Sequence, residues 1–480
     1  MALQGPRIGR DPLKSENKNF LMNVGYQGLM LAFPLITVPL VSRALGAQNI
    51  GIYSYTYSIA NMFMLAGMLG VSNYGNRSVA RVRDDEAALS REFSSTYALQ
   101  VAVSLVAVGA YALYLVLFPQ QYGRVAWIQL IQVLSVCFDV SWLYFGLEKF
   151  FQTIVRNLIV KVLSLLLIAV FVKGPDDLWA YTLIMACSTL MSQLYLFCSV
   201  PRYVKPVRPE LRGSARRLRD IAVLFLPVAA YSVYRVLDKT MLGSLSTVTE
   251  LGYFENAEKL INIPIAVITA LGTVMLPRMS YVLSKSDADY RSIILSSMRL
   301  ALTLSCAMAM GLIVIADDIC PVFFGPGFEG CAPVIRLLAI TVICSAWSSV
   351  VRTQFLIPKA KDSVYVGSTV GAAAVNLVLN VILIPSFGSL GACAGTIAAE
   401  LFIVIFQTIA TGSDLDARKY FGILFVHLAK SSVVAVAAFC AASLFDNALV
   451  RLVIEIVVYV FLFLVLNWQF VVKDFLGWSK

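Results

Sequence analysis

Long runs of apolar residues follow one another along almost the whole chain of 480 residues, and only short polar segments separate them. A helix needs about 20 such residues to cross the hydrocarbon core of a bilayer. The runs have about this length, so they predict about fourteen membrane-spanning helices. Because the loops are short, no separate soluble domain fits beside these helices. We therefore expect an all-α polytopic membrane protein.

The composition supports this fold class. Hydrophobic residues make up 59% of the chain and charged residues 14%, whereas soluble domains carry about 25% charged residues. This balance excludes a soluble enzyme, a disordered chain and a small disulfide-linked scaffold. The net charge of +10 is typical of basic loops that orient membrane helices, so we expect no nucleic-acid partner.

The predicted helices divide into two bundles of six and a final pair. The predicted spans are 19–42, 51–73, 95–118, 125–147, 155–172, 178–200, 220–242, 251–277, 293–316, 332–357, 363–384, 389–411, 421–445 and 449–472. The predicted units are a cytoplasmic tail (1–18), an N-terminal six-helix bundle (19–200), a basic cytoplasmic linker (201–219), a C-terminal six-helix bundle (220–411), and helices 13 and 14 with a cytoplasmic tail (412–480).

The two bundles resemble each other in sequence. Segments 42–63 and 238–261 both place Leu-Gly at the end of one helix, then a short polar loop, then Gly and Tyr in the next helix. Another pair of similar loops lies at about the same offset, near 200 residues. Six is an even number, so the repeats would have the same orientation in the membrane. Transporters built in this way rock about a site near the membrane midplane.

The lysines and arginines of the loops fall almost entirely on one side of the predicted membrane. Four lie on the other side, namely Arg43, Arg124, Lys173 and Arg451. Basic loops stay in the cytoplasm. This asymmetry predicts that both termini are cytoplasmic.

The sequence offers no catalytic or metal site. The single histidine, His427, allows no His-rich metal cluster and no usual Ser-His or Cys-His pair, and the nine cysteines form no C-x-x-C motif. A phosphate-binding G-x-x-x-x-G-K-[ST] loop is absent, so we expect no ATP hydrolysis. We expect no enzyme and no bound cofactor. A coupling cation (Na⁺ or H⁺) or the membrane potential is the expected energy source.

Ionisable residues within the predicted spans are the main candidates for a site, because a charge there costs a few kcal/mol and usually faces a cavity or a partner. Helices 7 and 8 carry three candidate cations for an anionic group, Arg235, Lys239 and Lys259. They also carry three candidate coupling or charge partners, Asp238, Glu255 and Glu258. These six residues predict a polar lumen between the bundles. They are also compatible with local ion pairs that neutralise one another near the outer helix ends, an interpretation that we favour less.

Other charges in the spans are more isolated. Arg43, Arg77 and Arg352 are further candidate cations of the lumen, but Arg43 and Arg77 end their helices and can simply reach the membrane surface. Asp139 lies near the middle of its span, where so short a carboxylate does not reach water. We therefore interpret Asp139 as a candidate site for a coupling ion or proton.

Two pairs near the C-terminus have a structural interpretation. His427 and Lys430 lie in helix 13, outside the repeat, and we expect them to be structural. Arg451 and Glu455 have the i,i+4 spacing of an ion pair on one helix face.

The run SRALGAQNIGIYSYTYSIANMFMLAGMLGVSNYGNRSVARVR, which begins at Ser42, resembles the opening of bacterial polysaccharide-repeat-unit flippases of the Wzx type. These belong to the multidrug/oligosaccharidyl-lipid/polysaccharide exporter superfamily. Further similar stretches cover nearly the whole chain: WLYFGLEKFFQTIVRNLIVK (142–161), LDKTMLGSLSTVTELGYFENAEKL (237–260), VMLPRMS (274–280), FFGPGFEGCAPVIRLLA (323–339) and VNLVLNVILIPSFGSLGACAGTIAAE (375–400).

The resemblance implies two six-helix bundles that alternate between inward-open and outward-open states in the bacterial inner membrane. It implies that the substrate is an undecaprenyl-diphosphate-linked oligosaccharide, moved outward for capsule or surface polysaccharide synthesis. The implied partners are this substrate, membrane lipids, and the polymerase and glycosyltransferases of the same pathway. By analogy with the lipid-linked peptidoglycan precursor flippase, helices 13 and 14 would hold the polyprenyl tail in a groove.

The resemblance also bears on the site. Family motifs match at Arg43, Arg77, Asp238 and Lys239. The cationic lumen of the family would here comprise Arg235, Lys239, Lys259 and Arg352.

Three other functions agree less well with the sequence. A cation-coupled multidrug exporter of the same fold would need an acidic, aromatic cavity, which the basic residues of helices 7 and 8 and the two extra helices disfavour. A membrane-embedded polymerase or glycosyltransferase would need a sizeable outer loop, and every predicted outer loop is short. A purely structural membrane partner would not need charges in its spans.

Overall fold

A computed structural model describes residues 12–68, 70–118, 121–210, 218, 221, 236–283, 287–412 and 414–468. In this part of the chain every regular element is a helix, as expected for an all-α membrane protein. Nine helical segments among the described residues are long and apolar enough to cross a membrane. The count of fourteen spans stays a prediction, because most of the seventh, 220–242, lies outside the described residues.

The N-terminal half contains α1 (Pro12–Met68), α2 (Val71–Val82), α3 (Glu86–Leu117), α4 (Gly123–Ser135), η1 (Val136–Phe138), α5 (Ser141–Gly146), α6 (Phe150–Phe171), η2 (Pro175–Asp177), α7 (Leu178–Ser199) and η3 (Val200–Arg202). The C-terminal half begins with helical residues 236–245. It continues with α9 (Val248–Leu283), α10 (Asp287–Ile319), η4 (Cys320–Phe324), α11 (Cys331–Val351), η5 (Arg352–Leu356), α12 (Asp362–Thr411), α13 (Ala417–Ala442) and α14 (Ala448–Leu466).

Two of these helices each contain two of the predicted spans. The backbone of α1 bends at Gly46, where φ is 74°, and that of α12 bends at Gly388, where φ is 55°. Glycine adopts such positive φ values without the steric cost that a Cβ would add. The arms of α12 fold back on each other, since Gln407 Nε2 donates to Ser368 Oγ at 3.1 Å. In each of these two helices, a kink at a single glycine therefore replaces the loop that the sequence predicts between the two spans.

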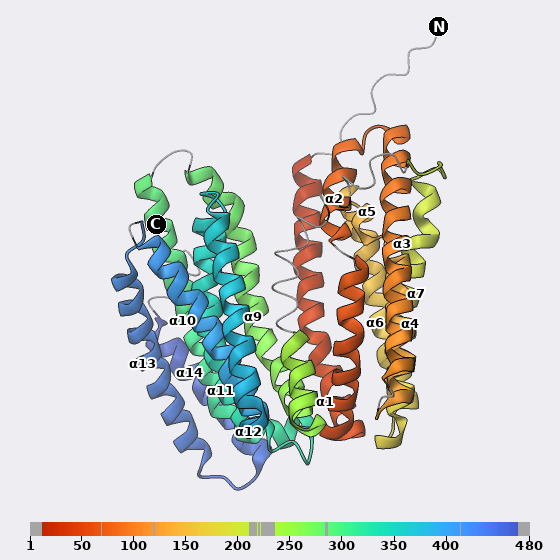
Figure 1. The fold of residues 1–480 in the computed structure, drawn as a ribbon. Coiled ribbons are helices and arrows are strands. Elements are labelled where there is room, and N and C mark those ends of the chain that lie inside the picture. The colour runs from red at the N-terminus through yellow and green to blue at the C-terminus, as the bar shows by residue number, and fades with distance from the viewer. Residues whose placement is uncertain are drawn as a thin grey trace.

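Figure 1 shows the helices in two bundles, with α1 to α7 in one and α9 to α14 in the other, and the bundles meet where α1 approaches α9. The largest apolar core joins the two halves, because Leu45 and Ile50 of α1 pack with Leu251 and Phe254 of α9. A second core lies within the first bundle around Trp142. The expected two-bundle fold is confirmed.

Each bundle has a hydrogen bond between the turn that joins its first two helices and the turn that joins its last two. Asn49 Nδ2, in the turn of α1, donates to Pro175 O at 2.8 Å. In the second half, the Glu250 carboxylate accepts a hydrogen bond from Ser389 N at 3.0 Å. In each half the turn between the first two helices thus docks on the turn between the last two, which agrees with a duplicated bundle.

The described start of the basic linker runs along α3. Lys205 N donates to Ser90 Oγ at 3.1 Å, and Glu210 N donates to Ser95 Oγ at 3.0 Å. The linker is therefore attached to the first bundle by hydrogen bonds from its backbone N–H groups to serine hydroxyls, and most of its remaining residues lie outside the described part.

Candidate functional site

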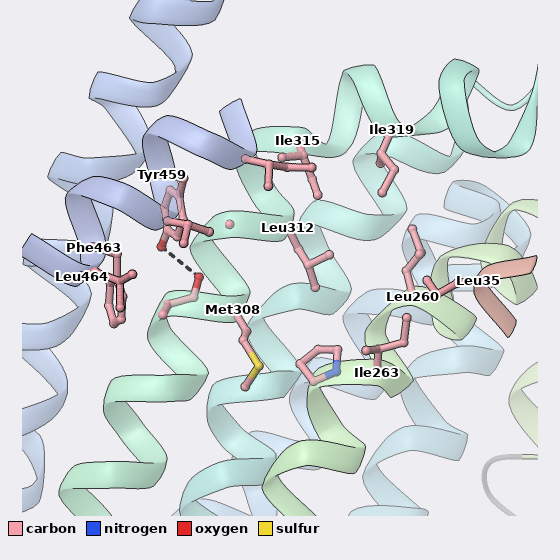
Figure 2. A pocket seen from close by; sticks show the side chains of 15 residues that line it. Leu35, Leu260, Ile263, Met308, Leu312, Ile315, Ile319, Tyr459, Phe463 and Leu464 are labelled. Atoms are coloured by element: carbon pink, nitrogen blue, oxygen red, sulfur yellow. Dashed lines mark hydrogen bonds between the residues drawn. The ribbon is translucent and has the colours of Figure 1, made fainter. Parts of the chain in front are cut away.

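An apolar groove of about 420 Å³ opens between α9, α10 and α14, with Leu35 of α1 at one end (Figure 2). Met308, Leu312, Ile315 and Ile319 line it from α10 at spacings of three and four residues, which puts them on one helix face. Tyr459 of α14 donates its only polar hydrogen to Ala307 O at 2.8 Å, so its ring presents a purely apolar surface. The groove can therefore hold a hydrocarbon chain.

Of the helix pair that the resemblance assigns to the lipid tail, only one helix borders the apolar groove. Helix α14 lines the groove with Ile456, Tyr459, Val460, Phe463 and Leu464, whereas no residue of α13 lines it. The reason is packing, because Val434 and Ala438 of α13 are buried against Tyr459 of α14 and against Met310 and Val314 of α10.

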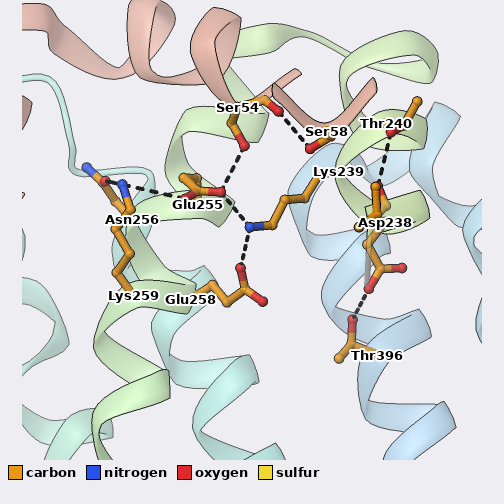
Figure 3. A network of polar contacts seen from close by, with 11 residues as sticks. Ser54, Ser58, Asp238, Lys239, Thr240, Glu255, Asn256, Glu258, Lys259 and Thr396 are labelled. Carbon is orange, nitrogen blue, oxygen red and sulfur yellow. Dashed lines mark hydrogen bonds and ion pairs between the residues drawn. The ribbon is translucent and has the colours of Figure 1, made fainter. Parts of the chain in front are cut away.

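A network of charged side chains lies where the two bundles meet (Figure 3). Lys239 Nζ contacts Glu255 Oε2 and Glu258 Oε2, each at 2.7 Å. Lys259 Nζ lies 3.5 Å from Glu255 Oε1. Only 15% to 30% of the surface of these four side chains is exposed. We call Lys239, Glu255, Glu258 and Lys259 the central network; it contains two cations and two carboxylates.

Polar side chains of α1 connect the central network to the first bundle. Ser54 Oγ donates to Glu255 Oε2 at 2.8 Å, and Asn256 Nδ2 donates to Ser42 Oγ at 2.9 Å. Both serines are almost fully buried. The contacts between the bundles here are therefore polar and directional, and any change in the angle between the bundles must break or rebuild them.

Two glycines allow the backbones of α1 and α9 to touch. A Cβ at Gly51 would overlap Val248 O, and a Cβ at Gly252 would overlap Ala47 O. We call these four residues the seal. Gly51 and Gly252 are 201 residues apart in sequence, as are Ala47 and Val248, and as are Ser54 and Glu255. Equivalent positions of the two repeats thus face each other across the pseudo-twofold axis.

Asp238 occupies a separate, buried position beside the central network. Asn380 Nδ2 donates to Asp238 Oδ1 at 2.5 Å, and Thr396 Oγ1 donates to Asp238 Oδ2 at 3.3 Å. The Asp238 side chain is 4% exposed. A small cavity of about 60 Å³ touches Asp238, Glu258 and Glu400, which is room for about one or two waters or a cation.

A second small cavity, of about 80 Å³, follows the first within the C-terminal bundle. Arg352 and Glu400 line it, and Glu400 lines both cavities. The guanidinium of Arg352 lies 5.8 Å from the centre of the Tyr365 ring. Arg352 is therefore near a polar interior, but it belongs to the far end of this bundle and does not join the central network.

The remaining candidate cations are distributed over the molecule. Arg43 Nη2 donates to Val322 O at 2.5 Å, which ties α1 to η4 of the second bundle beside the seal. Arg77 lies on the short helix α2 with an exposed side chain. Arg235 lies outside the described residues. Lys239 and Lys259 are thus the two predicted cations that the structure brings together.

Asp139 lies at a break between η1 and α5, where its carboxylate accepts hydrogen bonds from the first residue of α5. Its Oδ1 accepts hydrogen bonds from Ser141 N at 3.0 Å and from Ser141 Oγ at 2.5 Å. Its carbonyl accepts from Gln100 Nε2 at 2.8 Å, and Gln100 Oε1 accepts from Trp142 Nε1 at 2.9 Å. The carboxylate thus forms an Asx turn that caps the first N–H of α5, one residue before the N-cap position of Val140.

Substitutions of Asp139 separate a capping role from an ion-binding role. An asparagine keeps the accepting oxygen, so we expect Asp139→Asn to fold and transport nearly as the unmodified protein does. Asp139→Ala removes the cap and should cost about 1 kcal/mol of stability. Transport activity and thermal unfolding in detergent measure the two effects. A strong loss of transport by a normally folded Asp139→Asn variant would instead support a coupling ion at this carboxylate.

Several residues of the site were not expected from the sequence. Tyr53 and Tyr57 of α1 stack with their ring centres 5.8 Å apart, and Tyr181 of α7 meets Tyr53 edge-on at 4.8 Å. The i,i+4 spacing of the first two tyrosines was a visible signal for a shared helix face. The partners of Asp238 lie more than 140 residues away, and no local pattern reveals them.

Comparison with known proteins agrees with this geometry. Residues 17–283, more than half of the chain, match a family model described as polysaccharide biosynthesis protein. The chain belongs to this family. A second model, described as lipid II flippase MurJ, matches residues 179–465. As a member of these transporter families, the chain is a multi-pass membrane transporter and not an enzyme.

Two relatives align with most of this chain. A proposed O-antigen transporter of Shigella dysenteriae is 21% identical over 395 residues, which cover 81% of this chain and 98% of that relative. A proposed O-antigen transporter of Escherichia coli (strain K12) is 19% identical, and the alignment covers 81% and 95%.

Solved structures share the fold of this family member. The lipid II flippase MurJ in an inward closed conformation matches with a TM-score of 0.69 at 13% identity, over 94% of this chain and 99% of that one. An inward-facing MATE-family multidrug transporter matches with a TM-score of 0.61 at 15% identity, over 80% and 94%. At such identities the likeness concerns the fold alone.

Proposed function

We propose that the chain is a flippase that moves lipid-linked oligosaccharide repeat units from the inner to the outer leaflet. One observation carries the proposal: the apolar groove and the central network lie next to each other on α9. Leu260 and Ile263 line the groove, while Glu255, Glu258 and Lys259 belong to the network. Within about two helical turns, α9 thus offers one surface for hydrocarbon and another for charge, which matches an amphiphilic substrate.

The central network is suited to the charged part of such a substrate. The diphosphate that joins an undecaprenyl chain to its sugars does not cross hydrocarbon without cations. Lys239 and Lys259 would exchange Glu255 and Glu258 for phosphate oxygens, since charge-assisted hydrogen bonds of both kinds are similar in strength. No bond of the substrate is made or broken, so transport needs only a different affinity in each conformation.

The tyrosines of the first bundle are suited to the sugars. Tyr53 and Tyr57 project from the helix that carries Ser54, so they lie on the first bundle next to the central network. An aromatic face attracts the polarised C–H groups of a sugar ring through its quadrupole. We propose that the diphosphate binds the second bundle while the sugars contact the first.

The coupling cation expected from the sequence is also a proposal. Of the described carboxylates within the helices, Asp238 has the surroundings that suit a small cation, because the small cavity that it lines is also lined by the carboxylate of Glu258 and the hydroxyl of Thr396. Oxygen atoms from these groups are the ligands that hard cations prefer. Transport measured with and without a sodium or proton gradient distinguishes Na⁺, H⁺ and the membrane potential.

We propose that the protein lies in the bacterial inner membrane with both termini in the cytoplasm. Lys205 and Pro326 test this topology, because the first ion-pairs with Glu86 at 3.2 Å at the start of α3 and the second is exposed in the turn between η4 and α11. In a background without the exposed Cys198 and Cys440, a cysteine at 326 should react with an impermeant maleimide in intact cells. A cysteine at 205 should react only after lysis. The reverse pattern would contradict the topology.

Surface polysaccharide in cells tests the proposed function. Deleting the gene should stop surface polysaccharide and cause lipid-linked repeat units to accumulate at the inner leaflet, as expected when a step between glycosyltransferases and polymerase is lost. Re-expression should restore both. A deletion that leaves the polysaccharide intact and raises sensitivity to cationic drugs would favour the multidrug exporter of the same fold.

A further inference from the structure

A second groove lies between the N-terminal halves of α10 and α13, away from the apolar groove and on the side of the membrane that the proposed topology makes cytoplasmic. It has a volume of about 480 Å³, and its lining comprises Leu295 and Arg299 of α10 with Lys419, Gly422, Ile423, Val426 and His427 of α13. The apolar groove uses α10 only from Ala307 onward. The two grooves are therefore separate, and we call this one the inner groove.

Basic residues dominate the charge of the inner groove. Lys419, at the start of α13, pairs with Asp416 at 3.1 Å, and both side chains are about half exposed or more. Arg299 is exposed. His427 is buried, and its Nε2 lies 3.2 Å from Thr303 Oγ1. In the described part of the chain, Asp416 is the acidic residue that ion-pairs with a cation lining this groove.

Lys430 continues the same face of α13 at greater depth. Gly422, Val426 and Lys430 follow one another at intervals of four residues, which places them on one side of the helix. Lys430 is about 20 Å from the start of α13 at 1.5 Å per residue, near the middle of the helix. Arg299 and Lys430 both lie near enough to act electrostatically on His427.

Neither Arg299 nor Lys430 has a described hydrogen bond or ion pair through its side chain. A charged side chain within a membrane is costly unless an opposite charge or water compensates it. Lys419 already pairs with Asp416, whereas Arg299 and Lys430 have no opposite charge in the described part of the chain, and an anion that reaches them from the bilayer would supply one. A soluble anion would not use the apolar side chains Leu295, Ile423 and Val426, which line the same groove.

We propose that the inner groove is a binding site for an anionic glycerophospholipid of the cytoplasmic leaflet. Its phosphate would lie between Arg299 and Lys419, with the amine of Lys430 extended toward it, and an acyl chain would pack on Ile423 and Val426. Basic pockets between membrane helices on the cytoplasmic side are the usual places for such headgroups. The proposal concerns α10 and α13 alone and does not depend on the transported substrate.

Lipid retention by the purified full-length protein tests the proposal. The protein is exchanged into detergent with equal amounts of phosphatidylglycerol and phosphatidylcholine that have the same acyl chains, and co-purifying lipid is counted by native mass spectrometry. The unmodified protein should retain phosphatidylglycerol preferentially, and high salt should weaken the preference. Each neutralised cation should reduce it about fivefold, so Arg299→Gln with Lys430→Gln should reduce it about 25-fold.

Arg418→Gln is the matched control, because Arg418 is adjacent to Lys419 but does not line the groove. It should retain the full preference for phosphatidylglycerol. Size-exclusion profiles of all variants verify that they are folded. Equal retention of both lipids by the unmodified protein would mean that only non-specific boundary lipid occupies the groove. An unchanged preference in the double variant would place the anionic lipid elsewhere. Either result would overturn the proposal.

Discussion

Replacing Gly51 by valine should nearly abolish transport. The added Cβ would overlap the Val248 carbonyl, and this atom belongs to backbone that cannot rotate away as a side chain would. Overpacking of this kind costs about 1–3 kcal/mol, which shifts an equilibrium roughly five- to 150-fold. The cost applies only to the state in which α1 and α9 are in contact, so the variant should fold but should fail to close the seal.

Cysteine accessibility measures this effect directly. Ile50 is 3% exposed beside the seal, so Ile50→Cys should be protected from an impermeant maleimide in the otherwise unmodified protein and reactive when Gly51→Val is added. Gly109→Val is the control, because a Cβ at Gly109 of α3 would meet no atom within 4 Å. A Gly51→Val variant that transports normally, with Ile50→Cys still protected, would show that the seal does not take part in transport.

Replacing Lys239 by alanine should destabilise the protein strongly and stop transport. The substitution leaves Glu255 and Glu258 without the amine that contacts both of them at 2.7 Å. Removing one partner from a buried ionic group costs about 3–5 kcal/mol, because the remaining charge stays buried. Lys239→Arg keeps the positive charge and should be tolerated much better. Thermal unfolding in detergent and transport in cells give the two readouts.

A second substitution separates stability from transport. Lys239→Met with Glu258→Gln removes one charge of each sign and leaves the Lys259–Glu255 pair. We expect this double variant to regain most of the lost stability but not transport, because the diphosphate still lacks a cation. Arg83→Ala is the control, since the Arg83–Glu148 pair is largely exposed and such pairs contribute about 0–1 kcal/mol. Full transport by the double variant would make Lys239 a structural charge.

The sequence alone predicts most of the fold, because each span has to be a helix of about 20 apolar residues. The kinks are harder to place. Gly46 and Gly388 each reverse the chain within a residue or two, and the sequence around them predicts only that a short loop is present. The repeat was also visible, since Ser54 and Glu255 are equivalent positions. That these positions contact each other depends on the packing of the two bundles.

Pairing of charges is the part of the site that sequence spacing predicts least well. Lys239, Glu255, Glu258 and Lys259 are conspicuous as charges within apolar runs, but their contacts depend on how two helices pack. Arg451 is an example of a charge whose partner the sequence spacing does not predict. Its spacing predicts a pair with Glu455, and this prediction is wrong, because Arg451 Nε donates to Asp318 of α10 at 3.0 Å and 3.1 Å. A partner on another helix replaces the one on the same face.

The most direct test of the proposed function uses the purified protein in liposomes that contain a fluorescent undecaprenyl-diphosphate-linked oligosaccharide in the inner leaflet only. We expect the label to become accessible to an impermeant quencher far faster than in protein-free liposomes, and we expect Gly51→Val and Lys239→Ala to remove most of this acceleration. Equal rates with and without the folded protein, under sodium and proton gradients as well as without them, would contradict a flippase of lipid-linked oligosaccharides.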